Sequence, residues 1–198
     1  GVAGAGPLVA QDPASRADFP AAKRNYSPYL DQNHPTRVFW GDTHLHTSYS
    51  TDAGMVGNRL GPEEAYRFAM GQEVTSSTGQ RVKLARPLDF LVIADHSENL
   101  GLAPMIATSD PILLKSPVGK LWHDMVKEGK GFEAFRDWIE RGSTDGRDPI
   151  NSPEMMRSAW EVMVKAAEDH NVPGRFTAFI GYEWTSTPGG NNLHRNVI

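Results

Sequence analysis

Two histidines separated by a single residue stand within residues 41–54, a segment whose residue types could bind a metal. His44 and His46 follow the short apolar run at residues 38–40, which predicts the end of a strand. Residues two apart in an extended chain face the same way, so both imidazoles would point together off that strand. Neutral imidazole nitrogens suit zinc, iron, manganese or nickel. Asp52, beyond a turn-rich loop, could add a carboxylate oxygen.

Three later segments also carry ligand-type residues at the ends of apolar runs. His96 closes the run over residues 88–94, Glu183 follows the run at 176–180, and His194 precedes an apolar C-terminal stretch. A His-x-His pair alone is often an ordinary surface or core feature. Four predicted strands, each with such a residue at one end, are a stronger indication of one shared site.

The number of candidate ligands predicts more than one cation. A catalytic metal needs about three protein ligands and an open position. The candidates are His44, His46, Asp52, His96, Glu183 and His194. A carboxylate such as Glu183 can bridge two ions, and a water held there would become a metal-bound hydroxide nucleophile near neutral pH. The cations would also hold the oxygens of a phosphoryl-like group.

Three further acids stand beside the candidate ligands. Asp42, Asp95 and Glu98 could orient the imidazoles or carry protons during catalysis. Simple capping or surface solvation is the alternative for each of them. We place Asp95 and Glu98 as the catalytic candidates of the site.

The elements that must position these residues alternate between strands and helices. A helix is predicted to start at Pro62, a hairpin over residues 74–84, and a longer helix after Ser152, the predicted N-cap. Apolar residues at helical spacing predict further helices over 118–126 and 132–139. This order favours an α/β fold with parallel strands, whose chemistry gathers at the strands' C-terminal ends. His194, which precedes its strand, is the exception.

Composition limits the function classes. The chain has 198 residues, a net charge of -4, no cysteine and no apolar run long enough to span a bilayer. Disulfides, thiolate metal sites and a cysteine nucleophile are therefore excluded, and neither nucleic acid nor a membrane is an expected partner. We expect an irregular arm over residues 1–36 and one domain over 37–198. Small apolar residues at 1–10 favour the end of a signal peptide, and hence a periplasmic or secreted rather than a cytoplasmic protein.

The motifs together resemble the PHP (polymerase and histidinol phosphatase) superfamily. The resemblance rests on Asp42-x-His44-x-His46-Thr47 with Ser50 and Asp52, on Ala94-Asp95-His96, on Gly181-Tyr182-Glu183, and on His194. The segments around the first two motifs are most similar to an uncharacterised bacterial family of PHP-like proteins, a domain of unknown function. The resemblance covers about residues 26–198.

The resemblance implies part of a distorted seven-stranded (β/α)7 barrel with two or three divalent ions, Zn, Mn or Fe. His44 and His46 would bind the first metal, Glu183 would bridge, and His194 would join the second. Asp52 and His96 would serve a third, although several members carry His where Asp52 stands. Members typically hydrolyse phosphoesters, so a small-molecule ester is the implied substrate. A sulfate ester or another ester is the alternative, as is a non-catalytic metal-binding module.

We expect the chain to be a fragment of that barrel. The superfamily places further ligands downstream of the fourth motif, and only about four strands can be counted here by apolar pattern. The remainder of the barrel would come from a downstream segment or a second chain, since an incomplete sheet exposes a raw edge. Mass spectrometry of the native protein should detect a polypeptide extending past Ile198, and a native chain ending there would contradict this expectation.

Overall fold

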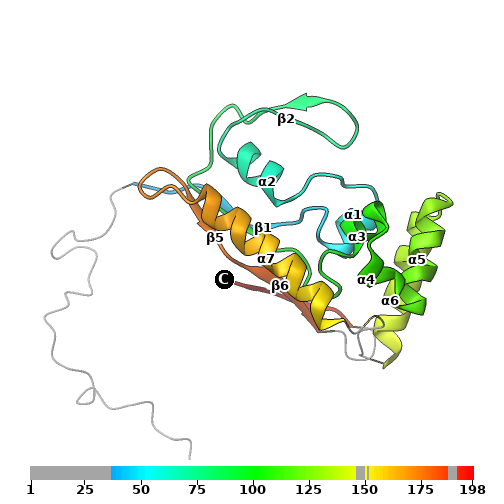
Figure 1. Cartoon of the computed structure of the whole chain (residues 1–198). Helices are drawn as coiled ribbons and strands as arrows, with labels where there is room; N and C mark the ends of the chain where they lie inside the picture. Colours follow the sequence, from blue (N-terminus) through cyan, green and yellow to red (C-terminus); the bar gives the residue numbers. More distant parts are fainter. Residues whose placement is uncertain (1–36, 146–149, 151, 187–190) are drawn as a thin grey trace, which may run out of the picture. The chain divides into compact units, whose positions relative to one another are not determined.

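The computed structural model describes residues 37–145, 150, 152–186 and 191–198. The arm expected over residues 1–36 lies outside the described residues. A compact unit that runs from Phe39 to Ile198 carries every element (Figure 1). The helices are α1 Thr51–Met55, α2 Pro62–Ala69, α3 Leu102–Thr108, α4 Pro111–Leu114, α5 Pro117–Lys127, α6 Gly131–Asp145 and α7 Pro153–His170. The strands are β1 Gly41–Leu45, β2 Val74–Thr75, β3 Arg81–Val82, β4 Phe90–Ile93, β5 Thr177–Phe179, β6 Tyr182–Ser186 and β7 Leu193–Val197.

A parallel sheet of order β1-β4-β5 lies at the centre of the unit. Phe90 of β4 pairs with Gly41 on one side and with Thr177 on the other, and both strand pairs are parallel. The fold is therefore of the mixed α/β class that the order of elements predicts. The hairpin predicted over residues 74–84 is confirmed by the antiparallel pair of β2 and β3.

The first strand begins later than its apolar run predicts. Residues 38–40 were expected to form the end of a strand, but they lie before β1 and are exposed, with Trp40 at 62 %. Pairing with β4 starts at Gly41, where a Cβ would lie 2.4 Å from the Phe90 ring, so the close approach of the two strands requires glycine. As a result His44 lies inside β1 rather than in a loop beyond it.

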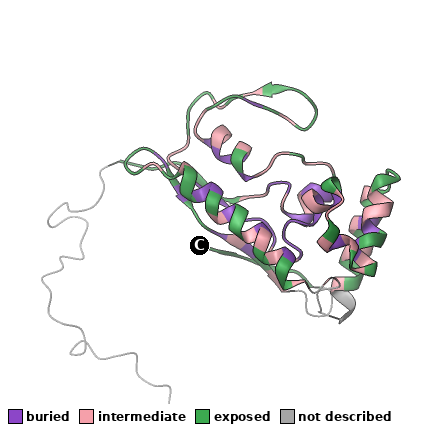
Figure 2. Cartoon of the chain, in the orientation of Figure 1, coloured by how far each residue is buried: buried purple, intermediate pink, exposed green. Residues whose placement is uncertain are grey.

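Two helices cover one face of the parallel sheet. Leu91 and Ile93, two residues apart in β4, both belong to a buried cluster that also contains Tyr66 of α2 and Met163 of α7. The buried side of α7 faces this cluster and its other side is exposed (Figure 2). The helix begins as predicted, with the Ser152 hydroxyl accepting from the Met155 backbone amide. The buried residues of α7 are Met155, Ala159, Met163, Ala166 and Ala167.

A second buried cluster joins the shorter helices. Trp122 of α5 and Met155 are fully buried in it, together with Leu102 of α3 and Met55 of α1. The helices expected over 118–126 and 132–139 are confirmed as parts of α5 and α6. Helix α1, which the sequence did not predict, carries Asp52 in its first turn. This cluster therefore fixes the position of one candidate ligand.

The last two strands form a separate antiparallel hairpin. The apolar run from residue 176 was expected as one strand, but it breaks at Ile180 and Gly181 into β5 and β6. A Cβ at Gly181 would lie 2.6 Å from Val92 Cγ1 and 2.8 Å from the Val197 carbonyl oxygen. Strand β7 pairs antiparallel with β6, so the expectation of parallel strands is wrong for this pair.

The described strands make three sheets and no closed barrel. All five residues of β7 are exposed. Within the described ranges, no helix is long and apolar enough to cross a membrane. The expected periplasmic or secreted location stays a prediction.

Two helical glycines offer a matched test of this packing. A Cβ at Gly54 in α1 would lie 2.3 Å from the Ser48 carbonyl oxygen and 2.4 Å from Ala103 Cβ. We expect Gly54→Ala to lower the free energy of unfolding by about 1–3 kcal/mol through overpacking. Gly142→Ala in α6 should instead raise it by about 0.5–1 kcal/mol, because nothing lies within 4 Å of its Cβ. Denaturant unfolding measures both, and equal effects would contradict the packing of α1 on α3.

Candidate metal centre

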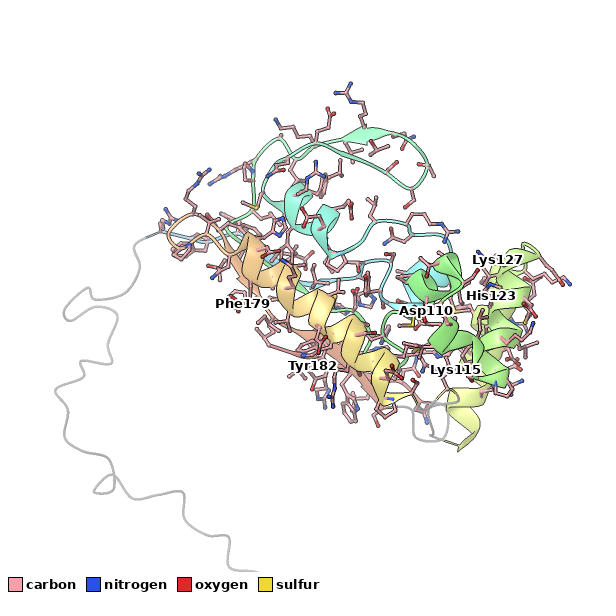
Figure 3. The ribbon with its side chains drawn as sticks, in the orientation of Figure 1. Asp110, Lys115, His123, Lys127, Phe179 and Tyr182 are labelled. Carbon is pink, nitrogen blue, oxygen red and sulfur yellow. The ribbon has the colours of Figure 1, made fainter. Side chains whose placement is uncertain are left out.

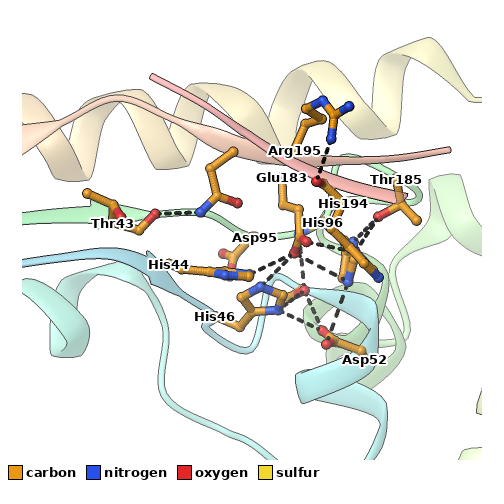
Figure 4. A network of polar contacts seen from close by, with 12 residues as sticks. Thr43, His44, His46, Asp52, Asp95, His96, Glu183, Thr185, His194 and Arg195 are labelled. Carbon is orange, nitrogen blue, oxygen red and sulfur yellow. Dashed lines mark hydrogen bonds and ion pairs between the residues drawn. The ribbon is translucent and has the colours of Figure 1, made fainter. Parts of the chain in front are cut away.

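The carboxylate of Glu183 in β6 lies at the centre of four imidazoles (Figure 4). Its side chain is only 1 % exposed. Three ring nitrogens face its Oε2 atom: those of His44 at 3.1 Å, His46 at 2.9 Å and His96 at 3.6 Å, in each case Nε2. His194 Nδ1 lies 2.7 Å from the other oxygen, Oε1.

Histidines are the only ion-pair partners of Glu183 in the described part of the chain. Removing a carboxylate from water costs several kcal/mol unless a cation or several donors compensate. A neutral imidazole has one N–H donor, and four rings packed together cannot all carry a positive charge without repulsion. A metal cation among the rings would satisfy both the carboxylate and the nitrogens.

A second carboxylate faces the same rings from α1. Asp52 Oδ1 lies 3.1 Å from His46 Nδ1, and Asp52 Oδ2 lies 3.7 Å from His96 Nε2. The Ser50 hydroxyl donates to Asp52 Oδ1 at 2.5 Å and accepts from the backbone amide of His96 at 3.1 Å. Ser50 therefore ties the start of α1 to the end of β4.

The six predicted ligands all converge, and they form three overlapping groups. Each group holds its donor atoms within 4.8 Å of one another: His44–His46–Glu183, His46–Asp52–His96 and His96–Glu183–His194. Two ligand atoms about 2.1 Å from a tetrahedral ion lie about 3.4 Å apart. The spacings between donor atoms therefore fit cations of that kind, and the nitrogen and oxygen donors suit zinc, manganese or iron.

An unsatisfied nitrogen supports the same fit. His46 Nε2 is buried and has no hydrogen-bond partner among the described residues, although it lies 2.9 Å from Glu183 Oε2. Buried polar atoms are normally bonded, so an exception calls for a specific explanation. Nε2 and Oε2 facing one another without a hydrogen bond are arranged as two ligands of one cation would be.

Backbone bonds hold the hairpin over the end of β4. The amide of Glu183 donates to the Asp95 carbonyl at 2.9 Å, and the Ser97 amide donates to the Glu183 carbonyl at 2.8 Å. Asn196 of β7 donates from Nδ2 to the Thr43 carbonyl of β1 at 2.8 Å. These bonds bring Glu183 and His194 to the end of the parallel sheet that carries His96.

Asp95 is wholly buried and bonded to the loop after β1. The Thr47 amide donates to its Oδ1 at 2.5 Å, and the Thr47 hydroxyl donates to its Oδ2 at 2.6 Å. Burial raises the pKa of Asp95 to about 6 in spite of these two bonds. A catalytic role for Asp95 stays a prediction. Its two bonds to Thr47 fix the loop that carries His46.

The other two acids also have definite partners. Asp42 accepts from the backbone amide of His44 at 2.8 Å, a local bond of the capping kind. Glu98 Oε1 accepts from the Thr185 amide at 3.0 Å, and Glu98 Oε2 lies 3.4 Å from His96 Nδ1. Burial alone would raise the pKa of Glu98, but His96 and the Thr185 amide outweigh it and lower the pKa.

The electrostatics keep Asp52 ionised. Burial alone would raise its pKa, but the bonds to His46 and Ser50 outweigh it and hold the pKa well below its usual range. For His46, burial lowers the pKa, yet the hydrogen bond and charge of Asp52 and the charge of Glu183 produce a net rise. A raised pKa favours the protonated ring, so a cation at His46 would compete with a proton for it.

Two described histidines, His123 and His170, lie outside the cluster. His123 of α5, near Lys127, contacts the Ser109 hydroxyl at 2.9 Å beside the turn after α3 (Figure 3). His170 at the end of α7 donates to the Ala166 carbonyl and stacks on Tyr66. Neither His123 nor His170 belongs to any of the three groups of candidate ligands.

Sequence reasoning missed two hydroxyl residues of the site. Ser50 belongs to the recognised motif but was given no role. Thr185 lies 2.9 Å from His96 Nδ1 and 3.1 Å from His194 Nδ1. It stands two residues after Glu183 in β6, so the alternation of a strand could have placed it on the same face.

The chain belongs to a family of unknown function. Residues 33–198 match the family described as Protein of unknown function (DUF3604). Comparison with curated proteins finds no match, and comparison with solved structures finds none either. The family therefore assigns no activity, and the argument for function rests on the geometry of the site and on the motifs.

The Thr47–Asp95 bond can be tested in the metal-free protein. We expect Thr47→Val to lower the free energy of unfolding by about 1–3 kcal/mol, because it leaves a buried carboxylate oxygen unsatisfied. Asp95 is protonated below its pKa of about 6 and then needs fewer donors. The loss should therefore be larger at about pH 7.5 than at about pH 5.

Thr177→Val, at an exposed position of β5, is the matched control and should change stability by less than about 0.5 kcal/mol. Urea unfolding at the two pH values makes the comparison. Equal losses for the two variants would show that Asp95 does not depend on Thr47.

Proposed function

We propose that the cluster binds two or three divalent cations and that the protein is a metal-dependent hydrolase of phosphomonoesters or phosphodiesters. The observation that carries this proposal is the buried Glu183 carboxylate, which faces nitrogens of four histidines and no Lys or Arg among the described residues. The resemblance of the motifs to the PHP superfamily supports phosphoesters as the substrate class.

In this proposal each ligand group holds one cation. His44, His46 and Glu183 would hold the first, and Glu183 with His194 would hold the second. Asp52 and His96 serve the third. When bound, such cations supply Lewis-acid chemistry: they polarise an ester, neutralise developing charge and make water more acidic.

The chain's own residues orient that chemistry. The side chains of His44 and His194 are 50 % and 42 % exposed, whereas Glu183 is at 1 %. A small ester would therefore approach from the side of His44 and His194. Glu98, at 33 % exposure and with a lowered pKa, is ionised at neutral pH, and its Oε2 atom faces His96 Nδ1 at 3.4 Å, where it favours a proton on that nitrogen.

We also propose that the fold is part of a PHP-type barrel. Three parallel strands with covering helices, followed by the β6–β7 hairpin, would be its first part. The full exposure of β7 supports a further segment or a second chain beside it, because an open strand edge normally acquires a partner. The ester-binding side of the site would then be completed by that partner.

A non-catalytic metal-binding module is the second candidate. The exposure of His44 and His194 favours it, because a solvent-open cluster lacks the enclosure that most catalytic sites have. Metal analysis combined with a screen of chromogenic phosphate and sulfate esters separates the two candidates. Turnover of a phosphate ester supports the hydrolase, turnover of sulfate esters alone changes the substrate class, and bound metal without turnover of any ester favours the module.

Replacing the central carboxylate is the direct test. We expect Glu183→Gln to weaken zinc binding by more than about 100-fold, beyond the loss typical of residues that only support a ligand. Hydrolysis should be abolished with little loss of fold. A chelator should lower the melting temperature of the wild-type protein, since a ligand at 100 times its Kd adds about 2.7 kcal/mol, and should barely change that of the variant.

Glu73→Gln, at an exposed residue paired with Arg81, is the matched control and should keep the metal content of the wild-type protein. Metal content is measured by elemental analysis after dialysis against zinc or manganese. Wild-type stoichiometry in Glu183→Gln would remove this residue from the metal centre.

A further inference from the structure

The Thr185 hydroxyl lies between two of the four histidines. Its Oγ1 atom is 2.9 Å from His96 Nδ1 and 3.1 Å from His194 Nδ1. Both rings belong to the ligand group that contains Glu183, and His96 also belongs to the group that contains Asp52. Thr185 thus contacts both rings of the second group, and one of them, His96, would also serve the third cation.

The surroundings of the His96 ring differ at its two nitrogens. Nδ1 faces a hydroxyl at 2.9 Å and the Glu98 Oε2 acceptor at 3.4 Å. Nε2 faces only carboxylate oxygens beyond hydrogen-bond distance, Asp52 Oδ2 at 3.7 Å and Glu183 Oε2 at 3.6 Å. A proton on Nδ1 therefore has partners in reach, and the lone pair on Nε2 is left to face the two carboxylates.

The Glu98 carboxylate fixes the position of Thr185. The Thr185 backbone amide donates to Glu98 Oε1 at 3.0 Å, and the Ser97 hydroxyl donates to the same oxygen at 3.0 Å. The other oxygen, Oε2, is buried, has no hydrogen-bond partner within the described ranges and lies 3.4 Å from His96 Nδ1. The carboxylate is thereby fixed beside His96. Because its Oε2 atom can only accept a hydrogen bond, it favours a proton rather than a lone pair on His96 Nδ1.

We propose that Thr185, supported by Glu98, is a positioning residue that keeps the proton of His96 on Nδ1 and so reserves Nε2 for a cation. Metal-binding histidines generally donate their second nitrogen to an oxygen in this way, which fixes the tautomer and the ring orientation. The part of this inference that concerns cation binding at Nε2 rests on the proposed function. The position of the proton on Nδ1 is expected in the metal-free protein as well.

The test compares Thr185→Val, which removes the hydroxyl, with Thr185→Ser, which keeps it. In zinc titrations we expect Thr185→Val to lower the affinity for the ions that His96 would hold by about 10–100-fold. The ion at His44, His46 and Glu183 should be retained, which also shows that the variant folds. Thr185→Ser should restore wild-type affinities, and Thr177→Val in exposed β5 should have no effect.

A second readout needs no metal. Nitrogen-15 NMR of the histidine rings in the metal-free protein should find His96 with its proton on Nδ1 in the wild-type and Thr185→Ser proteins. In Thr185→Val a larger share should carry the proton on Nε2. An unchanged tautomer and unchanged zinc affinities in Thr185→Val would overturn the inference. A wild-type protein that binds no zinc would overturn the metal proposal instead, while the tautomer comparison still decides the role of Thr185.

Discussion

A carboxylate removed from water must be compensated, and Glu183 is compensated only by imidazoles within the described chain. The rest of the site follows from this constraint. Four rings can surround one carboxylate only if the segments that carry them end at the same place, and nitrogens that point inward together are best compensated by a positive charge among them. The cations that we propose would account together for the burial of Glu183, the convergence of the histidines and the His46 Nε2 that has no hydrogen-bond partner in the described chain.

The scaffold brings together residues far apart in the chain through a small number of bonds. The parallel pairing of β1 with β4 brings His44 and His96 to the same end of the sheet, and a break at Gly181 lets the chain continue along the end of β4. The hairpin that follows brings Glu183 and His194 onto the same place. Helix α1, held in the second buried cluster, supplies the remaining carboxylate.

Residue type and position at the ends of predicted strands were enough to predict that the six candidate residues converge, because both are local properties of a sequence. Pairing is not local, which is why the start of β1 and the direction of β7 were missed. Close contacts at Gly41 and Gly181 decide those features, and they exist only once the strands are assembled. Thr185 was missed for a related reason, since its proposed role depends on rings contributed by the segment after β4 and by β7.

The central claim is that cations lie between the carboxylates and the histidines. Anomalous X-ray diffraction from crystals of the zinc-loaded protein, measured at the zinc absorption edge, tests it most directly. The account predicts anomalous peaks about 2.0–2.2 Å from Glu183 oxygens and from ring nitrogens of His44, His46 and His194. Peaks located elsewhere, or no peak beside Glu183 in fully loaded crystals, would contradict it.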